Sequence, residues 1–345
     1  MEAGKTGGID IRPQSRLKAA MRSARDLFEL TLGEPLQATS RLVTVDSPEF
    51  RASVQTRDGD IRISTGVVRQ LDDLWSRLLE TTVLTEGPSF ERIAADGISG
   101  LKSGRYADHS LVWLCLHELM HLHLGHRTLL GGAELVEVGS ASEHTYEQAI
   151  DPASVLDENE LPHMHKCLEM QADSEATDFF IGLFSESRYR EIRVLAVAVF
   201  AVMVLIEREN LRLGTGNITH PAAGTRFFTL MGHLFQMWSY PGAWLEPDDV
   251  GSRIRSAEPR DAAHFEAYSQ AVLVPLVHDA VMVATFAEAK RFIIDMGDKS
   301  ALFRDIFKVQ YADELKPEIL ATYAAKEWLT LMPINHKLLT FLQLT

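Results

Sequence analysis

The stretch HSLVWLCLHELMHLHL, residues 109–124, carries the pentad HELMH at positions 117–121 inside an apolar segment. An α-helix turns by about 100° per residue, so side chains four positions apart lie within about 40° of each other on one face. His117 and His121 could therefore grip one metal ion, since neutral imidazole is a good zinc ligand. Glu118 is rotated by about 100° and can reach a water on that metal without being a ligand. The alternative is a surface helix that carries histidines by chance, but the apolar surroundings of the pentad argue against it.

A catalytic zinc needs a third ligand from the protein. The arrangement HExxHxxGxxH is excluded, because this chain has Leu124 and Arg127 where that pattern requires glycine and histidine. The other known arrangement places a glutamate on a later helix. The segment EMQAD puts Glu169 and Asp173 on one helical face, so that Glu169 would complete a His2Glu set. Asp173 would then accept a hydrogen bond from the distal N–H of a ligand histidine. The alternative is an ordinary acidic helix face.

These motifs resemble a known family. HELMHLHLGH followed by EMQAD is similar to the gluzincin zinc metallopeptidases that contain HtpX and the prenyl-protein endopeptidases, with the Lit-like phage-exclusion endopeptidase as a second possibility. Softer matches flank the zinc motifs. RDGDIRISTGVV (57–68) looks like the family's hairpin strand before a helix, and THP (219–221) followed by Arg226 looks like its "HP…R" motif. Together the matches cover roughly residues 50–230. The resemblance implies that Glu169 is the third ligand and that the hairpin edge strand binds the substrate backbone.

The predicted reaction is hydrolysis of a peptide bond by a zinc-activated water. Glu118 would take the proton of that water and pass it to the leaving amine. His220 or Arg226 would stabilise the oxyanion, although His220 could equally be a structural cap. An extended peptide would pair with the hairpin edge at residues 60–65. Two alternatives stay open: a non-catalytic binding or regulatory module stabilised by zinc, and a zinc hydrolase of a non-peptide amide. A purely structural zinc site has no use for Glu118, and only the edge strand favours peptides.

The other histidines near these motifs have simpler interpretations. His123 lies about 200° around the helix from the nearest proposed ligand, so it cannot share the site. His126 is interpreted as a hydrogen-bonding residue at the helix end. His163 and His165 lie just upstream of Glu169 and could perturb the site or bind a second metal, and the sequence does not assign them a role.

We expect an α+β fold that is mainly α. An Asp-Gly pair between two β-rich runs predicts a hairpin within residues 41–65, and apolar residues at helical spacing predict helices over most of the rest. The predicted arrangement is a zincin-like domain with a short antiparallel hairpin or sheet packed on the active-site helix, plus a helical C-terminal part. The expected organisation is a flexible tail at 1–15, a metallopeptidase domain at 16–240 and a helical region at 263–345.

Composition limits the remaining functions. Of the 345 residues 46% are apolar and 24% charged, which is typical of a soluble globular protein. A net charge of −14 argues against nucleic acid as a partner. The only cysteines, Cys115 and Cys167, form no CxxC pair, which fits a reducing compartment. The longest apolar run, 194–206, is too short to span a bilayer. We therefore expect a cytoplasmic protein with a protein or peptide substrate and no stable membrane span. A peripheral protein that dips a helix into a membrane is the alternative, and the oligomeric state stays open.

Overall fold

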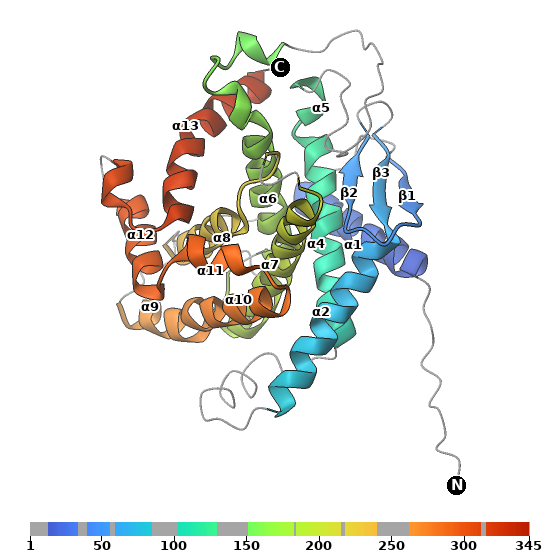
Figure 1. Cartoon of the computed structure of the whole chain (residues 1–345), viewed down its shortest axis with the longest axis horizontal. Helices are drawn as coiled ribbons and strands as arrows, with labels where there is room; N and C mark the ends of the chain where they lie inside the picture. The colour runs from blue at the N-terminus through green and yellow to red at the C-terminus, as the bar shows by residue number, and fades with distance from the viewer. Residues whose placement is uncertain are drawn as a thin grey trace.

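The computed structural model describes residues 13–33, 40–55, 59–84, 103–129, 151–182, 184–214, 218–239, 262–311 and 315–344. The predictions for most of the N-terminal tail, for part of the hairpin turn and for nearly all of the link after residue 239 lie outside these residues. The described part is mainly helical and contains one small sheet (Figure 1). This confirms the predicted α+β, mainly α fold class.

The described residues include twelve α-helices and three strands. The helices are α1 (Pro13–Leu32), α2 (Thr65–Leu84), α4 (Ser103–His123), α5 (His126–Leu129), α6 (Met164–Ile181), α7 (Tyr189–Arg212), α8 (Ala223–Ser239), α9 (Ala262–Tyr268), α10 (Val274–Phe286), α11 (Lys290–Met296), α12 (Lys299–Tyr311) and α13 (Tyr323–Leu344). The strands are β1 (Leu42–Val45), β2 (Ala52–Val54) and β3 (Ile61–Ser64). A π-helical segment, Ser269–Leu273, joins α9 to α10.

The sheet has the order β1-β3-β2, so β3 lies in its centre. Strands β2 and β3 form the predicted antiparallel hairpin, whereas β1 pairs with β3 in parallel. The expectation of an all-antiparallel sheet is therefore wrong for β1. The side chains of Ile61 and Ile63 are fully buried, as suits a central strand. Because β3 is paired on both sides, the predicted substrate edge at residues 60–65 is also wrong. The edge strand that lies beside α4 is β2 (Figure 1).

Helix α4 lies at the centre of the molecule and is packed against α1, α2, α6 and α7. Its apolar side chains are not confined to one stripe, and Trp113, Leu116, Leu119 and Met120 are all fully buried. A helix that is apolar on all sides belongs in a core. The polar groups of the pentad are consequently held inside the protein, where each of them needs a partner.

The helices after residue 261 share one core with the earlier ones. Helix α13 packs against α6 and α8, and α10 packs against α7. The rings of Phe200, Phe227 and Phe292 form a cluster with centroids 4.6–5.5 Å apart. Arg193 and Asp279 form a buried bidentate ion pair at 2.6 and 2.8 Å between α7 and α10. The predicted division into two domains is not tested by these contacts and stays a prediction.

One described helical stretch, Ala262–Phe286, is long and apolar enough to cross a membrane by length and composition. Within its most apolar window, 44% of the residues are buried inside the protein. Core helices of soluble proteins meet the same criterion, and this stretch carries Asp279 of the buried ion pair.

Candidate metal centre

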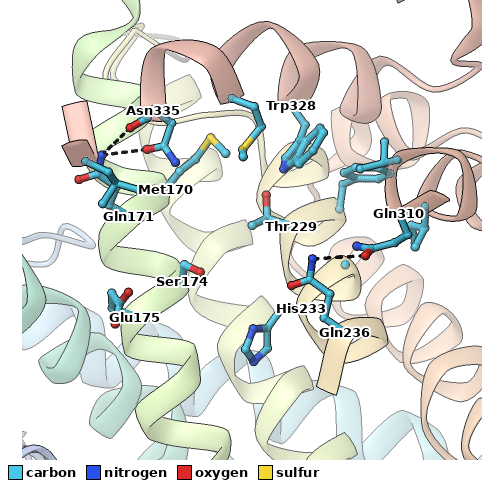
Figure 2. A pocket seen from close by; sticks show the side chains of 16 residues that line it. Met170, Gln171, Ser174, Glu175, Thr229, His233, Gln236, Gln310, Trp328 and Asn335 are labelled. Carbon is cyan, nitrogen blue, oxygen red and sulfur yellow. Dashed lines mark hydrogen bonds between the residues drawn. The ribbon is translucent and has the colours of Figure 1, made fainter. Parts of the chain in front are cut away.

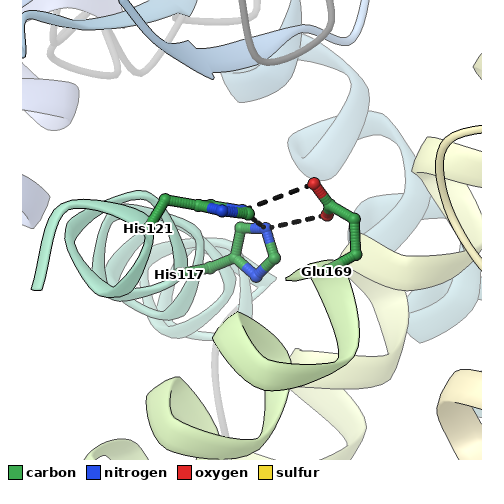
Figure 3. A group of neighbouring side chains, drawn as sticks. All are labelled: His117, His121 and Glu169. Atoms are coloured by element: carbon green, nitrogen blue, oxygen red, sulfur yellow. Dashed lines mark hydrogen bonds and ion pairs between the residues drawn. The ribbon is translucent and has the colours of Figure 1, made fainter. Parts of the chain in front are cut away.

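Three buried side chains from two helices point toward one another (Figure 3). His117 and His121 come from α4 and Glu169 comes from α6. The two Nε2 atoms are 3.1 Å apart, His117 Nε2 is 3.2 Å from Glu169 Oε2, and His121 Nε2 is 3.4 Å from Glu169 Oε1. Their exposed fractions are 2%, 2% and 4%. The structure thus brings together the three residues that the sequence proposed as ligands.

These distances fit a tetrahedral ion. With metal–ligand bonds of about 2.0–2.1 Å, the ligand atoms of a tetrahedral site lie about 3.3 Å from one another. In addition, Glu169 Oε2 is buried and faces two imidazole nitrogens, His117 Nε2 at 3.2 Å and His220 Nε2 at 3.1 Å. Two imidazole nitrogens and a carboxylate, all buried, could hold a metal ion. The described residues contain no second such group, and His163 and His165 do not join this one.

On the outer side of His117, a carboxylate fixes the ring. Asp173 Oδ1 lies 3.0 Å from His117 Nδ1, as the EMQAD spacing suggested. Asp173 in turn accepts two hydrogen bonds from Arg226 of α8, both 2.6 Å long. All three side chains are buried. Because its guanidinium is directed at Asp173, Arg226 lies behind the metal ligand and does not line the cleft. The oxyanion role considered for Arg226 does not match this placement.

His126 fixes the ring of His121 in a corresponding way. Its Nδ1 lies 2.8 Å from Nδ1 of His121, and its Nε2 lies 2.9 Å from Oε1 of Gln171 on α6. Gly125, with φ of 71°, ends α4 and lets the chain turn back so that His126 is fully buried beside it. The sequence indicated a hydrogen-bonding residue at this helix end. It contained no local signal for Gln171, because this partner lies on α6, across a helix packing contact.

The carboxylates of Asp173 and Glu169 need a positive charge close to them. Burial lowers the pKa of His117, but the carboxylates of Asp173 and Glu169 outweigh it and raise that pKa to about 10 in the metal-free protein. Burial raises the pKa of Glu169, yet the charges of His220 and His121 hold it well below its ordinary value. A proton on His117 therefore balances the carboxylates when no metal is bound, and a metal ion would replace that proton.

Glu118 lies beside the three convergent groups without being one of them. It is 5% exposed and lines a small cleft of about 60 Å³ together with His117, His121 and Glu169. Burial raises the pKa of Glu118 to about 7, with a smaller contribution from Glu169. Its place at the cleft, outside the ligand set, is the one that a proton acceptor requires.

The other wall of the cleft comes from the loop before α8 and from β2. His220 lines it, with Nε2 at 3.1 Å from Glu169 Oε2 and Nδ1 at 2.9 Å from Thr219 Oγ1. Residues 50–53 line it as well. The N–H of Gln55 bonds to the C=O of Asp60, and the N–H of Ser64 bonds to the C=O of Arg51. In an antiparallel pair the intervening residues point their backbone groups outward. Ala52 therefore presents its N–H and C=O on the cleft side of β2.

Comparison with known proteins gives one family match. Residues 105–237 match the model of the Peptidase U49 family, a Lit-like family of metallopeptidases. The matched segment contains the pentad, the EMQAD segment, His220 and Arg226, and it covers less than half of the chain. Searches of curated proteins and of solved structures find no match. The family match supports a peptidase, and it does not support the HtpX and prenyl-protein endopeptidase assignment specifically.

Proposed function

We propose that the protein is a zinc-dependent endopeptidase of the Lit-like type in which Glu118 is the general base. The observation that carries this proposal is the buried His117–His121–Glu169 cluster with a separate carboxylate beside it at a cleft. A structural zinc site is usually closed by four protein ligands, whereas a catalytic one has three. The described residues supply three, and the match to a peptidase family over the same segment agrees with catalysis.

Zinc suits the ligand set, since it accepts two imidazoles and a carboxylate in tetrahedral geometry. Bound there, it would supply Lewis acidity toward a carbonyl oxygen and lower the pKa of a bound water toward about 7. Glu118 accepts the proton from the attacking water and donates it to the leaving amine. Its raised pKa, about 7, leaves the proton loosely held, which suits a group that must take and return it near neutral pH.

His220 is the group best placed to help with the developing oxyanion. Its Nε2 is 3.1 Å from Glu169 Oε2, and its ring lines the same cleft as Glu118. Thr219 fixes the orientation of that ring by a contact of 2.9 Å to Nδ1. We propose that His220 donates Nε2–H to the oxyanion when substrate is bound. Arg226 acts indirectly: it donates two hydrogen bonds to Asp173, which contacts the ligand His117.

We propose that the substrate is a peptide in extended form, which pairs with the outer edge of β2. Ala52 presents one N–H and one C=O on the cleft side, and these two groups form the pair that a peptide backbone needs. The contact places backbone against backbone, so it selects for peptides without selecting strongly among side chains. This edge replaces the one at residues 60–65 that the sequence suggested.

The test is a comparison of Glu118→Gln with Glu175→Gln. The amide keeps the shape of Glu118 but cannot accept a proton, and Glu118 is not a ligand, so the zinc content of Glu118→Gln should stay at about one per chain. Its cleavage rate should fall by about 10²–10⁴-fold. Glu175 lies on α6 but outside the cluster and the cleft, so its variant should keep both zinc and activity. Activity is measured as new N-termini in a proteome digest, with and without chelator.

Two results would contradict the proposal. Loss of zinc from Glu118→Gln would make this residue a structural part of the site. Retention of zinc together with undiminished activity would mean that the metal is not catalytic, and a zinc-stabilised binding module would then explain the cluster. Cleavage of non-peptide amides alone would change the substrate class and leave the catalytic residues in place.

A further inference from the structure

We infer that His126, Gln171 and Asn335 form a hydrogen-bonded chain that fixes the tautomer of the metal ligand His121. These three are positioning residues, because they touch neither metal nor substrate and act through His121. The inference rests on the proposed zinc site, and it adds a part of the C-terminal helix α13 to the support of that site. Asn335 lies almost one hundred residues beyond the segment that matches the peptidase family.

The direction of every hydrogen bond follows from one group. The backbone C=O of Asn335 can only accept, and Gln171 Nε2 lies 3.4 Å from it and 2.9 Å from Asn335 Oδ1. Figure 2 shows both contacts, between α6 and α13. The NH2 group of Gln171 therefore faces α13, and its Oε1 faces the other way, toward His126. This oxygen can only accept, so the bond from His126 requires an N–H at Nε2.

The consequence for His121 follows at once. A neutral His126 that carries its proton on Nε2 has a lone pair on Nδ1, and this lone pair accepts from Nδ1–H of His121 at 2.8 Å. His126 is fully buried and its two ring nitrogens face only His121 and the neutral amide of Gln171, so its ring is neutral. His121 with its proton on Nδ1 leaves the Nε2 lone pair free to face Glu169 and His117. That is the tautomer which a metal ligand at Nε2 must have.

The three hydrogen-bonded side chains are buried in the core. His126 is fully buried, Gln171 is 3% exposed and Asn335 is 8% exposed. Asp173 does the same task for His117, so each ligand ring has a partner at its Nδ1 atom. A carboxylate accepts the Nδ1–H of His117, whereas a neutral imidazole accepts the Nδ1–H of His121. One negative charge fewer lies in the cluster as a result, which limits how strongly protons compete with the metal.

Two substitutions at His126 distinguish the hydrogen bond to His121 from the hydrogen bond to Gln171. Asn places an amide oxygen where Nδ1 of histidine lies and can accept from His121, whereas Gln places its amide where Nε2 lies and leaves Nδ1–H of His121 without an acceptor. We expect His126→Asn to bind zinc within about 3-fold of wild type. His126→Gln should bind zinc about 10–100-fold more weakly, the usual effect of losing a partner of a ligand histidine.

The dissociation constant for zinc is measured by competition with a chromophoric chelator on the full chain. As a second readout, ¹⁵N chemical shifts of the His121 ring in the metal-free protein at pH 8 should show protonation at Nδ1 in wild type and His126→Asn, and a mixture of tautomers in His126→Gln. His336→Gln is the control, because this side chain is exposed on α13 next to Asn335. Its affinity for zinc should equal that of wild type.

The outcomes are distinguishable. A wild-type protein that binds no zinc would overturn the proposed function itself. Zinc binding by wild type with an equal dissociation constant in His126→Gln would overturn only the positioning chain. If His126→Gln does not fold, Gln171→Leu replaces it, since it removes the acceptor of His126 Nε2–H. An unchanged dissociation constant in Gln171→Leu would equally overturn the inference, and a weakening of about 10-fold or more supports it.

Discussion

Removal of Arg226 should destabilise the protein strongly, because this side chain forms a buried ion pair with Asp173 and does not line the cleft. The side chain makes two hydrogen bonds of 2.6 Å to Asp173, and both partners are at least 95% buried. Loss of one partner from a buried ion pair typically costs about 3–5 kcal/mol, and here Asp173 would lose Arg226 and keep only His117 as a positive neighbour. We therefore expect the free energy of unfolding of Arg226→Met to fall by about that amount. At about 2–4 °C per kcal/mol, Tm should fall by roughly 6–20 °C, toward the lower end for so long a chain.

The measurement is denaturant unfolding of the metal-free protein, with a double variant and a matched control. Asp173→Asn/Arg226→Met removes the charge that lost its partner and should recover part of the loss. Together with the single variant Asp173→Asn, it gives the coupling energy of the pair. Arg193→Met breaks a pair of similar geometry and burial between α7 and α10, at 2.6 and 2.8 Å. It should cost a similar amount while leaving the affinity for zinc unchanged, since Arg193 contacts no group of the cluster.

The opposite pattern would refute this reasoning. A donor to the oxyanion is worth about 10²–10³-fold in kcat. If Arg226→Met unfolded at the same denaturant concentration as wild type but lost kcat by that factor, Arg226 would face the substrate, as the "HP…R" resemblance suggested. The placement behind Asp173 would then not describe the working enzyme.

Three further predictions concern the metal, its protons and the substrate edge. Glu169→Ala should lose zinc during dialysis against chelator whereas Glu175→Ala should not, and equal retention would remove Glu169 from the ligand set. Because the pKa of His117 is raised to about 10 without metal, zinc binding at pH 8 should release about one proton per protein molecule. Calorimetry in buffers of different ionisation enthalpy measures this release. A release near zero would contradict the charge balance of the cluster. Ala52→Pro removes the outward N–H from an edge position that tolerates proline. Loss of this one hydrogen bond should lower kcat/KM for peptides by about 2–13-fold and leave the zinc content unchanged. An unchanged kcat/KM would exclude β2 as the substrate edge.

Much of the ligand set could be proposed from the sequence because helical spacing is a local property. Residues four apart share a face wherever a helix forms, so the pairing of His117 with His121, and of Glu169 with Asp173, needs no knowledge of the fold. The apolar character of the stretch around the pentad also indicates a buried helix. What the sequence could not provide is the relative placement of two helices, which brings Glu169 to within 3.4 Å of both rings.

The failures arise where an assignment depends on contacts far apart in the chain. The Asp-Gly turn predicts that β2 and β3 pair, but β1 is inserted on the other side of β3 by packing on α1, and no local pattern records this. The substrate edge was predicted wrongly for the same reason. A strand is at the edge only if one of its sides has no neighbouring strand, and β1 occupies the second side of β3. Arg226 was placed by a motif, and a motif does not say which way a long side chain points.

The contact between Gln171 and Asn335 joins residues 164 positions apart. During synthesis at about 5–20 residues per second, roughly 8–33 s separate the appearance of these two side chains. For that time the pentad and the EMQAD segment exist without the helix against which Gln171 comes to rest. Gln171, the partner of His126, gains its own partner Asn335 only after α13 has been made. The order of translation therefore delays the finished metal centre until nearly the whole described part of the protein is present.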